Sequence, residues 1–281
     1  MDSHCKGPFS VLIVTLLSVL FCIPAGAEEA ADLSAQNQAT TAPAPDPAPQ
    51  SAPTSDDDKW HFVIAPYLWF PGISGNVGAL GHDASVHASP TDVLGYFNFG
   101  IMGAVEARRN RLIVPVDFMW VRLGDNKSVP ETDLDQTSLN VKVTESVLTP
   151  KVGFRFADTE RWKADALFGI RYWHLGQNIT LNPSGLGVSP SANWVDFNLG
   201  MRVAAAVTPK VGITAFADEG AGGSRLDYQA GGFLGYKIKP TIALLLGWRY
   251  LYVDYKDRSA KGFIFDVHQS GPMLGLTWDV K

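Results

Sequence analysis

Cysteine is nearly absent from this sequence, and the two that occur stand close to its start. Cys5 and Cys22 both precede Ala27 in the 281-residue chain. If residues 1–27 are removed on export, as argued below, the mature chain has no disulfide, thiolate metal site or cysteine nucleophile. Apart from His82 and His87, which stand in a glycine-rich segment expected to be a solvated loop, the six histidines show no cluster with metal-ligand spacing. We therefore expect neither a metal nor any other cofactor.

Charged residues are also scarce. They make up 18% of the chain, below the roughly 25% of ordinary soluble domains. With a formal net charge of −5, the chain has no general basic field, so we expect no nucleic-acid partner. Glycine (27 residues) and tryptophan (8 residues) are abundant instead, and 46% of the residues are hydrophobic. This mixture is typical of a glycine-rich β protein with an apolar exterior.

Only one long apolar run occurs, from Phe9 to Ile23, with Lys6 before it and the small residues Ala25 and Ala27 after it. This is the pattern of a signal peptide, and we predict residues 1–27 as that peptide, with cleavage before Glu28. A retained helical anchor is the alternative, but about 15 apolar residues fall short of the ~20 that span a bilayer. Residues 28–59, rich in Pro and Ala, bury too little to fold and are predicted to be a disordered linker.

After Trp60 the sequence alternates with period two, which predicts strands whose faces meet different surroundings. Residues 193–207 show this best. One face carries Val195, Phe197, Leu199, Met201, Val203, Ala205 and Val207, and the other carries Trp194, Asp196, Asn198, Gly200, Arg202, Ala204 and Ala206. Such runs are longer than the 5–6 residues of ordinary strands and match the ~9–11 needed to cross a bilayer at a tilt. A soluble β-sandwich is the competing fold.

The polar face carries charge in mid-strand, and Trp248, Tyr250 and Tyr252 gather at one end of an apolar face, as in an interfacial girdle. We therefore predict that residues 60–281 form an all-β, antiparallel, up-and-down transmembrane barrel in the outer membrane. Short turns alternate with longer polar loops. In outer-membrane barrels the short turns are periplasmic and the long loops are extracellular, and we expect the same here.

Ten strands are predicted, with twelve as the alternative. They are expected near residues 60–70, 96–109, 112–123, 137–157, 162–182, 193–207, 210–219, 226–238, 241–256 and 262–281. Residues 75–88 would add a hairpin or extend the first strands, and whether residues 71–95 plug the lumen is left open. Changes of face are predicted after Thr149-Pro150 and after Gly271-Pro272, each through a β-bulge.

The predicted interior contains a repeated pair, glycine followed two residues later by arginine, as in Gly169/Arg171 and Gly200/Arg202. Arginine's planar fork suits pairing with carboxylates. The candidate lumen-lining residues are Glu106, Arg108, Asp117, Arg155, Asp165, Arg171, Asp196, Arg202, Asp218, Arg249 and Asp266. Two interpretations stay open: a salt-bridged core that fills a narrow barrel, or a charged constriction in a channel for small polar solutes.

An outer-membrane hydrolase, either an omptin-like protease or a lipid hydrolase, is the alternative function. Asp133 and Asp135 in one loop, with Asp266 and His268 near the end of the last strand, resemble the acid pair and Asp-His pair of omptin proteases. Such short acidic pairs are common in solvated turns, and we expect no enzyme activity. Lys256, Arg258 and Lys261 could contact lipopolysaccharide phosphates from the last loop.

Residues 60–281 resemble the small porin-like outer-membrane β-barrel proteins of Gram-negative bacteria. The resemblance rests on Tyr67-Leu68-Trp69 with Gly72 and Gly75, Glu106-Ala107-Arg108, Gly169-Ile170-Arg171-Tyr172-Trp173 and the amphipathic C-terminal strand. It implies a structural envelope protein or a low-conductance pore, with membrane lipid, lipopolysaccharide, the barrel assembly machinery and small solutes as partners, and it brings no catalytic residue. The chain departs from the family in ending at Lys281 rather than at an aromatic residue.

Overall fold

The computed structural model describes residues 59–79, 81–124, 138–182, 186–257 and 262–280, all within one compact unit, Pro53–Lys281. The predicted signal peptide (1–27) lies outside the described residues, as does the predicted linker (28–59) except for its last residue. Both stay predictions. No helix in the described ranges has the length and hydropathy needed to cross a bilayer.

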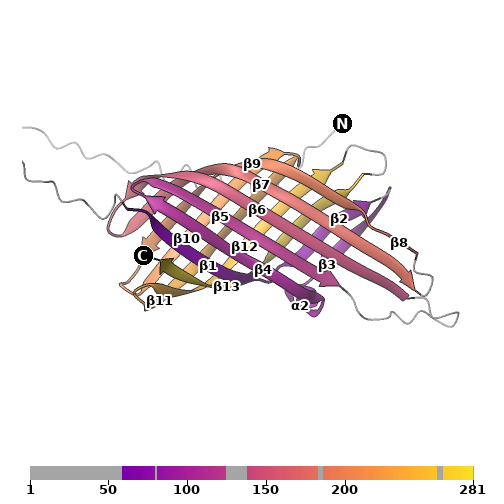
Figure 1. Ribbon diagram of the computed structural model, residues 1–281, viewed down its shortest axis with the longest axis horizontal. Helices are drawn as coiled ribbons and strands as arrows, with labels where there is room; N and C mark the ends of the chain where they lie inside the picture. Colours follow the sequence, from indigo (N-terminus) through magenta and orange to yellow (C-terminus); the bar gives the residue numbers. More distant parts are fainter. Residues whose placement is uncertain (1–58, 80, 125–137, 183–185, 258–261, 281) are drawn as a thin grey trace, which may run out of the picture. The chain divides into compact units, whose positions relative to one another are not determined.

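Ten antiparallel strands form a closed ring, as the alternation predicts (Figure 1). In ring order they are β1 (His61–Trp69), β4 (Phe97–Arg109), β5 (Leu112–Gly124), β6 (Ser138–Asp158), β7 (Trp162–Asn182), β9 (Ser191–Ala206), β10 (Val211–Gly222), β11 (Leu226–Lys239), β12 (Ile242–Lys256) and β13 (Ile264–Val280). Pairing of β1 with both β4 and β13 closes the ring. The fold class and the strand number are confirmed.

The predicted hairpin forms, but outside the ring. Strands β2 (Gly72–Ala79) and β3 (His82–Ala88) pair with each other, and β2 continues along the β13 edge that β1 has left. The short strand β8 (Leu186–Val188) pairs with β7. The hairpin therefore lengthens the wall on the loop side, and the ring keeps ten strands rather than twelve.

Helix α2 (Pro90–Gly95) links this hairpin to β4. Ser89 caps it: the Ser89 hydroxyl accepts from the backbone N–H of Asp92, and the Asp92 carboxylate accepts from the backbone N–H of Ser89. This reciprocal arrangement satisfies donors that a helix start leaves open. The hydrogen bonds from Ser89 hold the pKa of Asp92 below its usual value.

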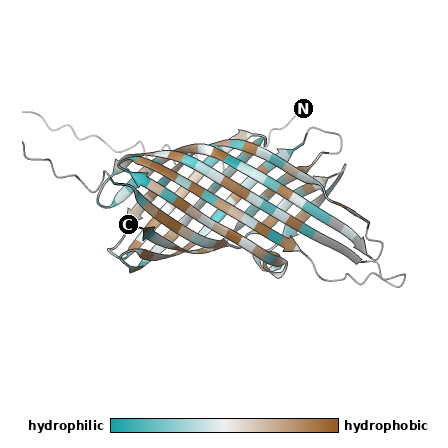
Figure 2. Cartoon of the chain, in the orientation of Figure 1, coloured by the Kyte–Doolittle hydropathy of each residue, from teal (hydrophilic) through white to brown (hydrophobic). Residues whose placement is uncertain are grey.

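The outer surface of the ring is apolar between two aromatic levels. Phe197 and Leu199 are 73% and 70% exposed at its middle, and hydrophobic and hydrophilic residues alternate along the strands (Figure 2). On β7, Trp162 lies near the short turns and Tyr172 stands ten residues further along. At ~3.3 Å per residue and a tilt of ~40°, this separation spans about 25 Å, the height of an outer-membrane apolar band.

Strands β6 and β7, each 21 residues long, continue beyond this band on the loop side. There the inner face of each strand becomes apolar and the outer face polar. The same alternate residues nevertheless continue to point inward. Odd-numbered residues of β6 point inward from Val147 to Arg155, and pairing runs across Pro150 and Pro272 without a register shift. The two predicted changes of face are therefore wrong. The pattern changes because, beyond the bilayer, the interior becomes apolar and the exterior polar.

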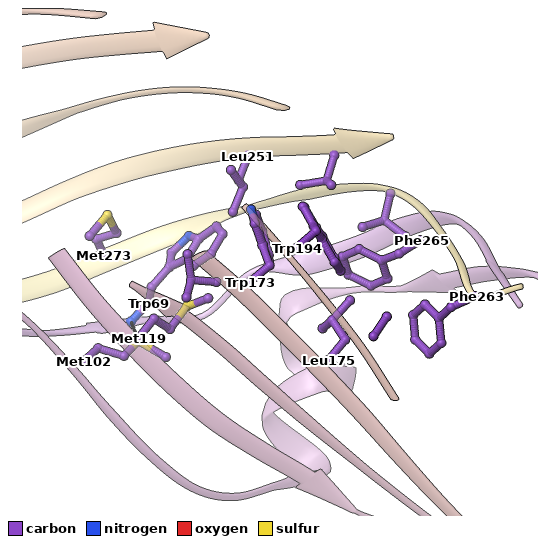
Figure 3. Close-up of a cluster of buried hydrophobic side chains, with 14 of the residues drawn as sticks. Trp69, Met102, Met119, Trp173, Leu175, Trp194, Leu251, Phe263, Phe265 and Met273 are labelled. Carbon is purple, nitrogen blue, oxygen red and sulfur yellow. Dashed lines mark hydrogen bonds between the residues drawn. The ribbon is translucent and has the colours of Figure 1, made fainter. Parts of the chain in front are cut away.

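Fifteen buried apolar residues form one cluster inside the barrel, which lies mainly in this extension and reaches down to Tyr67 and Met273 (Figure 3). At its centre Trp194 stacks between Trp173 and Tyr255, with ring centroids 5.4 and 3.9 Å away. Phe265 packs against both tryptophans at 6.4 and 6.5 Å, while Ile73 of β2 packs on the edge of the cluster. We call this cluster the outer core.

Candidate functional site

The lumen below the outer core contains charge, as the sequence predicts. Ten of the eleven predicted lumen residues lie on the inner face of their strands: Glu106, Arg108, Asp117, Arg155, Asp165, Arg171, Asp196, Arg202, Asp218 and Arg249. The exception is Asp266. Its carboxylate accepts from Tyr252 and Lys256, whose side chains lie on the outer wall. The prediction that Asp266 lines the lumen is wrong, because β13 keeps its odd residues inward across Pro272.

Arg171 is the centre of the charged interior. Its side chain is fully buried, and its guanidinium donates to Asp227 and, at 2.7 Å, to Asp218. Lys151 holds the second oxygen of Asp218 at 2.5 Å, and Trp173 donates its indole N–H to Asp227 at 3.0 Å. The four charged residues Lys151, Arg171, Asp218 and Asp227, which we call the central ion cluster, come from β6, β7, β10 and β11. They lie directly below the outer core, to which Trp173 belongs.

A third cation, Arg249, adjoins this cluster from the β12 side. The Arg249 guanidinium lies 4.9 Å from the Trp69 ring centroid and donates to the Tyr67 hydroxyl at 3.2 Å. That hydroxyl donates in turn to Asp117 at 2.7 Å, and Arg249 reaches the same carboxylate at 3.4 Å. Asp196 differs, since its described partners are the Trp194 indole and the backbone N–H of Ser224 rather than an arginine.

A third group of charges lies toward the short turns. Asp165 stands between Arg155 and Arg202, with its oxygens 2.8 Å from a nitrogen of each. Arg202 also donates to Glu106, which Arg108 contacts at 3.1 Å. Each cation in this group has at least one carboxylate partner, as buried charge requires.

Several interior residues were missed by the sequence analysis: Lys151, Asp227, Glu145 and the hydroxyl of Tyr67. Asp227 stands two residues before Gln229 on the inward parity of β11, so the alternation alone could have found it. Glu145, which accepts from Gln269 at 2.9 Å, was hidden by the mistaken change of face at Thr149-Pro150.

The glycines of the Gly-x-Arg pairs let neighbouring strands approach. A Cβ on Gly169 would lie 2.2 Å from the carbonyl oxygen of Pro150, and one on Gly200 would lie 2.4 Å from the Cβ of Asp218. Both distances are far below van der Waals contact. These glycines therefore allow the close interstrand spacing that brings Arg171 and Asp218 together.

A cavity of about 480 Å³ occupies the short-turn half of the lumen. Arg108, Lys163 and Asp279 line it at the mouth, where their side chains are 30%, 44% and 54% exposed. Lys151 and Arg249 line its inner end and are buried. Because short turns mark the periplasmic end, this cavity is a vestibule that opens toward the periplasm.

The vestibule ends at the central ion cluster. Of the fifteen outer-core residues, only Tyr67 and Met273 line it. Trp173, Leu175 and Trp194, which follow toward the loops, are buried. In the described residues, the inner end of the vestibule is therefore followed toward the loops by buried side chains of the central ion cluster and the outer core.

The residues of the alternative hydrolase site are only partly described. Asp133 and Asp135 lie outside the described residues. Asp266 and His268 lie on the outer wall of β13, where the His268 Nδ1 is 2.5 Å from the Tyr250 hydroxyl. His268 also packs on the Tyr252 ring, 4.7 Å between centroids. In the described ranges, no group of three or more His, Cys, Asp and Glu side chains is placed to hold a metal ion.

Comparison with known proteins supports the architecture. No family model and no curated protein matches the chain. The outer-membrane protease OmpT from Escherichia coli is similar with a TM-score of 0.50 and 7% identity, over 79% of this chain and 97% of that chain. Ail, the attachment invasion locus protein of Yersinia pestis, gives a TM-score of 0.37 and 13% identity, over 79% and 98% of the two chains. At 7% identity the likeness to OmpT concerns the fold alone, and the protein is a bacterial outer-membrane β-barrel.

Proposed function

We propose that this outer-membrane barrel is a closed structural protein of the envelope, with no path for solutes and no catalytic activity. The observation that carries the proposal is the central ion cluster beneath the outer core. Arg171, Asp218 and Asp227 cross the lumen with almost no exposed surface, and the stacked rings of Trp173 and Trp194 cover them.

The alternative role as a low-conductance pore needs a hydrated route past these groups. Moving Arg171 aside would break its contacts with two buried carboxylates, a change that costs several kcal/mol in comparable buried pairs. If the proposal is correct, the vestibule is a pocket that is closed at its inner end. Its charged lining residues, which include Arg155 and Arg202, then do not belong to a channel.

Planar-bilayer recording of the purified full-length protein tests the closed state. We expect no conductance steps from the wild type, with membrane insertion verified by flotation with lipid vesicles. Discrete steps in the wild type whose size changes in Arg202→Ala or Arg171→Ala would identify a pore and contradict the proposal.

The absence of catalysis is tested separately. We expect no turnover of peptide or phospholipid substrates by the folded protein. If turnover is detected, the variant His268→Ala decides its origin: loss of activity would support the hydrolase alternative, while unchanged activity would exclude His268 and still refute the non-catalytic proposal.

A further inference from the structure

A polar row crosses the outer wall of four strands on the loop side of Tyr172. Arg122 of β5 pairs with Thr144 of β6, Thr144 with Gly176 of β7, and Gly176 with Ser191 of β9. All four lie on the face opposite the lumen, because the nearby buried residues of the same strands, Met119, Val147, Leu175 and Ala192, have the opposite parity. The row therefore faces the surroundings of the barrel rather than its interior.

This row forms the floor of a groove with a volume of about 510 Å³. Its lining residues are Arg122, Lys142, Thr144, His174, Gly176, Gln177, Asn178, Ser189, Pro190 and Ser191, and we call it the outer groove. Gly176 leaves the floor open: at the position of a Cβ there, the only neighbour within 4 Å is the Nε2 of His174, at 3.6 Å.

The charge of the outer groove is of one sign. Its lining contains Arg122, Lys142 and His174 and no carboxylate, although the whole chain has a net charge of −5. In the described part of the chain, neither Arg122 nor Lys142 forms an ion pair, whereas the lumenal cations Arg155 and Arg171 each hold two carboxylates. The two outer cations are thus available to an external anion.

The next rows toward the membrane become progressively apolar. Trp120, Ser146, His174 and Asn193 form the adjacent cross-strand row, and Phe118, Leu148, Tyr172 and Val195 form the one after it. The Arg122 guanidinium lies 5.3 Å from the Trp120 ring centroid, which anchors the charge beside the aromatic level. A ligand that contacts all three rows has apolar chains, an anionic group and sugar-like hydroxyls, in that order.

We propose that the outer groove binds a phosphorylated glycolipid of the outer leaflet, lipopolysaccharide. Its acyl chains lie along Phe118 and Leu148, and a phosphate of its head group binds Arg122 and Lys142. Its sugar hydroxyls hydrogen-bond with the Thr, Ser, Asn and Gln side chains of the groove. This site differs from the lipopolysaccharide contact that the sequence predicts at the last loop. There Lys256 is already paired with Asp254 and Asp266.

The test compares binding of purified short-core lipopolysaccharide to the full-length protein in detergent, by native mass spectrometry and microscale thermophoresis. The double variant Arg122→Gln/Lys142→Gln removes the anion contacts, and Gly176→Leu fills the groove without changing charge. The matched control, Arg225→Gln/Lys256→Gln, removes the same two types of charge from positions already paired with Asp254. Heat-modified migration in gels verifies that each variant is folded.

We expect the Arg122→Gln/Lys142→Gln variant to bind about thirtyfold more weakly, from two membrane-surface cations, and Gly176→Leu to bind weakly as well. The control should bind like the wild type, and dephosphorylated glycolipid should bind the wild type, the control and Arg122→Gln/Lys142→Gln equally weakly. Equal affinity of wild type and Arg122→Gln/Lys142→Gln for the phosphorylated lipid would overturn the proposal. So would wild-type binding of inorganic phosphate as tight as that of the glycolipid, since the site would then recognise a free anion. If Gly176→Leu does not fold, the glutamine variants alone decide.

Discussion

Replacing Arg171 with methionine tests whether the central ion cluster stabilises the barrel. The substitution keeps most of the side-chain volume but leaves Asp227 with the Trp173 indole as its described donor, while Asp218 keeps Lys151 and Gln229. Loss of one partner from a buried ion pair costs about 3–5 kcal/mol. We expect a decrease of that size in the free energy of unfolding.

Arg202→Met is the matched comparison. Arg202 is 22% exposed, and its partners Asp165 and Glu106 retain Arg155 and Arg108. Because solvent screens this site and no carboxylate is left alone, we expect a loss of only about 1 kcal/mol. Urea titration of the barrel folded in phospholipid vesicles, followed by tryptophan fluorescence, measures both variants.

A double-mutant cycle completes the test. In Arg171→Met/Asp227→Asn the unpaired carboxylate is gone, so part of the stability should return, with a coupling free energy of about 1–3 kcal/mol. Equal losses for Arg171→Met and Arg202→Met, together with no recovery in the double variant, would refute the reasoning that the cluster is a coupled, desolvated unit.

Three further predictions concern the wall and the helix. Leu199→Arg places a charge near the middle of the lipid-facing band and should lower the free energy of unfolding in vesicles by about 3 kcal/mol; an unchanged value would contradict the lipid-facing assignment. Gly200→Val drives a side chain into Asp218 and should cost about 1–3 kcal/mol in the same titration, whereas a neutral effect would show that the strands can separate freely. Ser89→Ala should raise the pKa of Asp92 toward its ordinary value, measured by carboxyl NMR. Since the folded pKa is depressed, the stabilisation exists above the unfolded-state pKa and is lost as pH falls through the folded-state value; a pKa that does not move would show that the capping contact is weak.

Parity explains why so much of the lumen could be predicted from the sequence. Once a strand is placed, alternate residues fall on opposite faces, so Arg155, Arg171 and Arg202 could be assigned to the interior without coordinates. Parity does not give the relative heights of residues on distant strands. The pairing of Arg171 with Asp227, 56 residues later, depends on the stagger of four strands and could not be foreseen.

The error at Asp266 has a different physical origin. The prediction that Asp266 faces the lumen requires every apolar strand face to meet lipid. Beyond the bilayer, however, Phe265 and Val267 belong to the outer core and Asp266 lies on the outer wall. A long strand that crosses two environments reverses its polarity pattern without a bulge. Strand lengths well above the ~9–11 residues of a membrane crossing are the sequence signal for this situation.

The division of the β13 edge between β1 and β2 has a consequence for barrel closure. The seam between first and last strands is made by six residue pairs of β1 with β13, and the next seven pairs on the same edge belong to β2. If the seam opens during insertion or repair, the hairpin still holds the last strand in register. Because β2 remains paired with β13, the chain between the first and last strands is already closed into a loop. Re-forming the β1–β13 pairs then costs little additional loop-closure entropy.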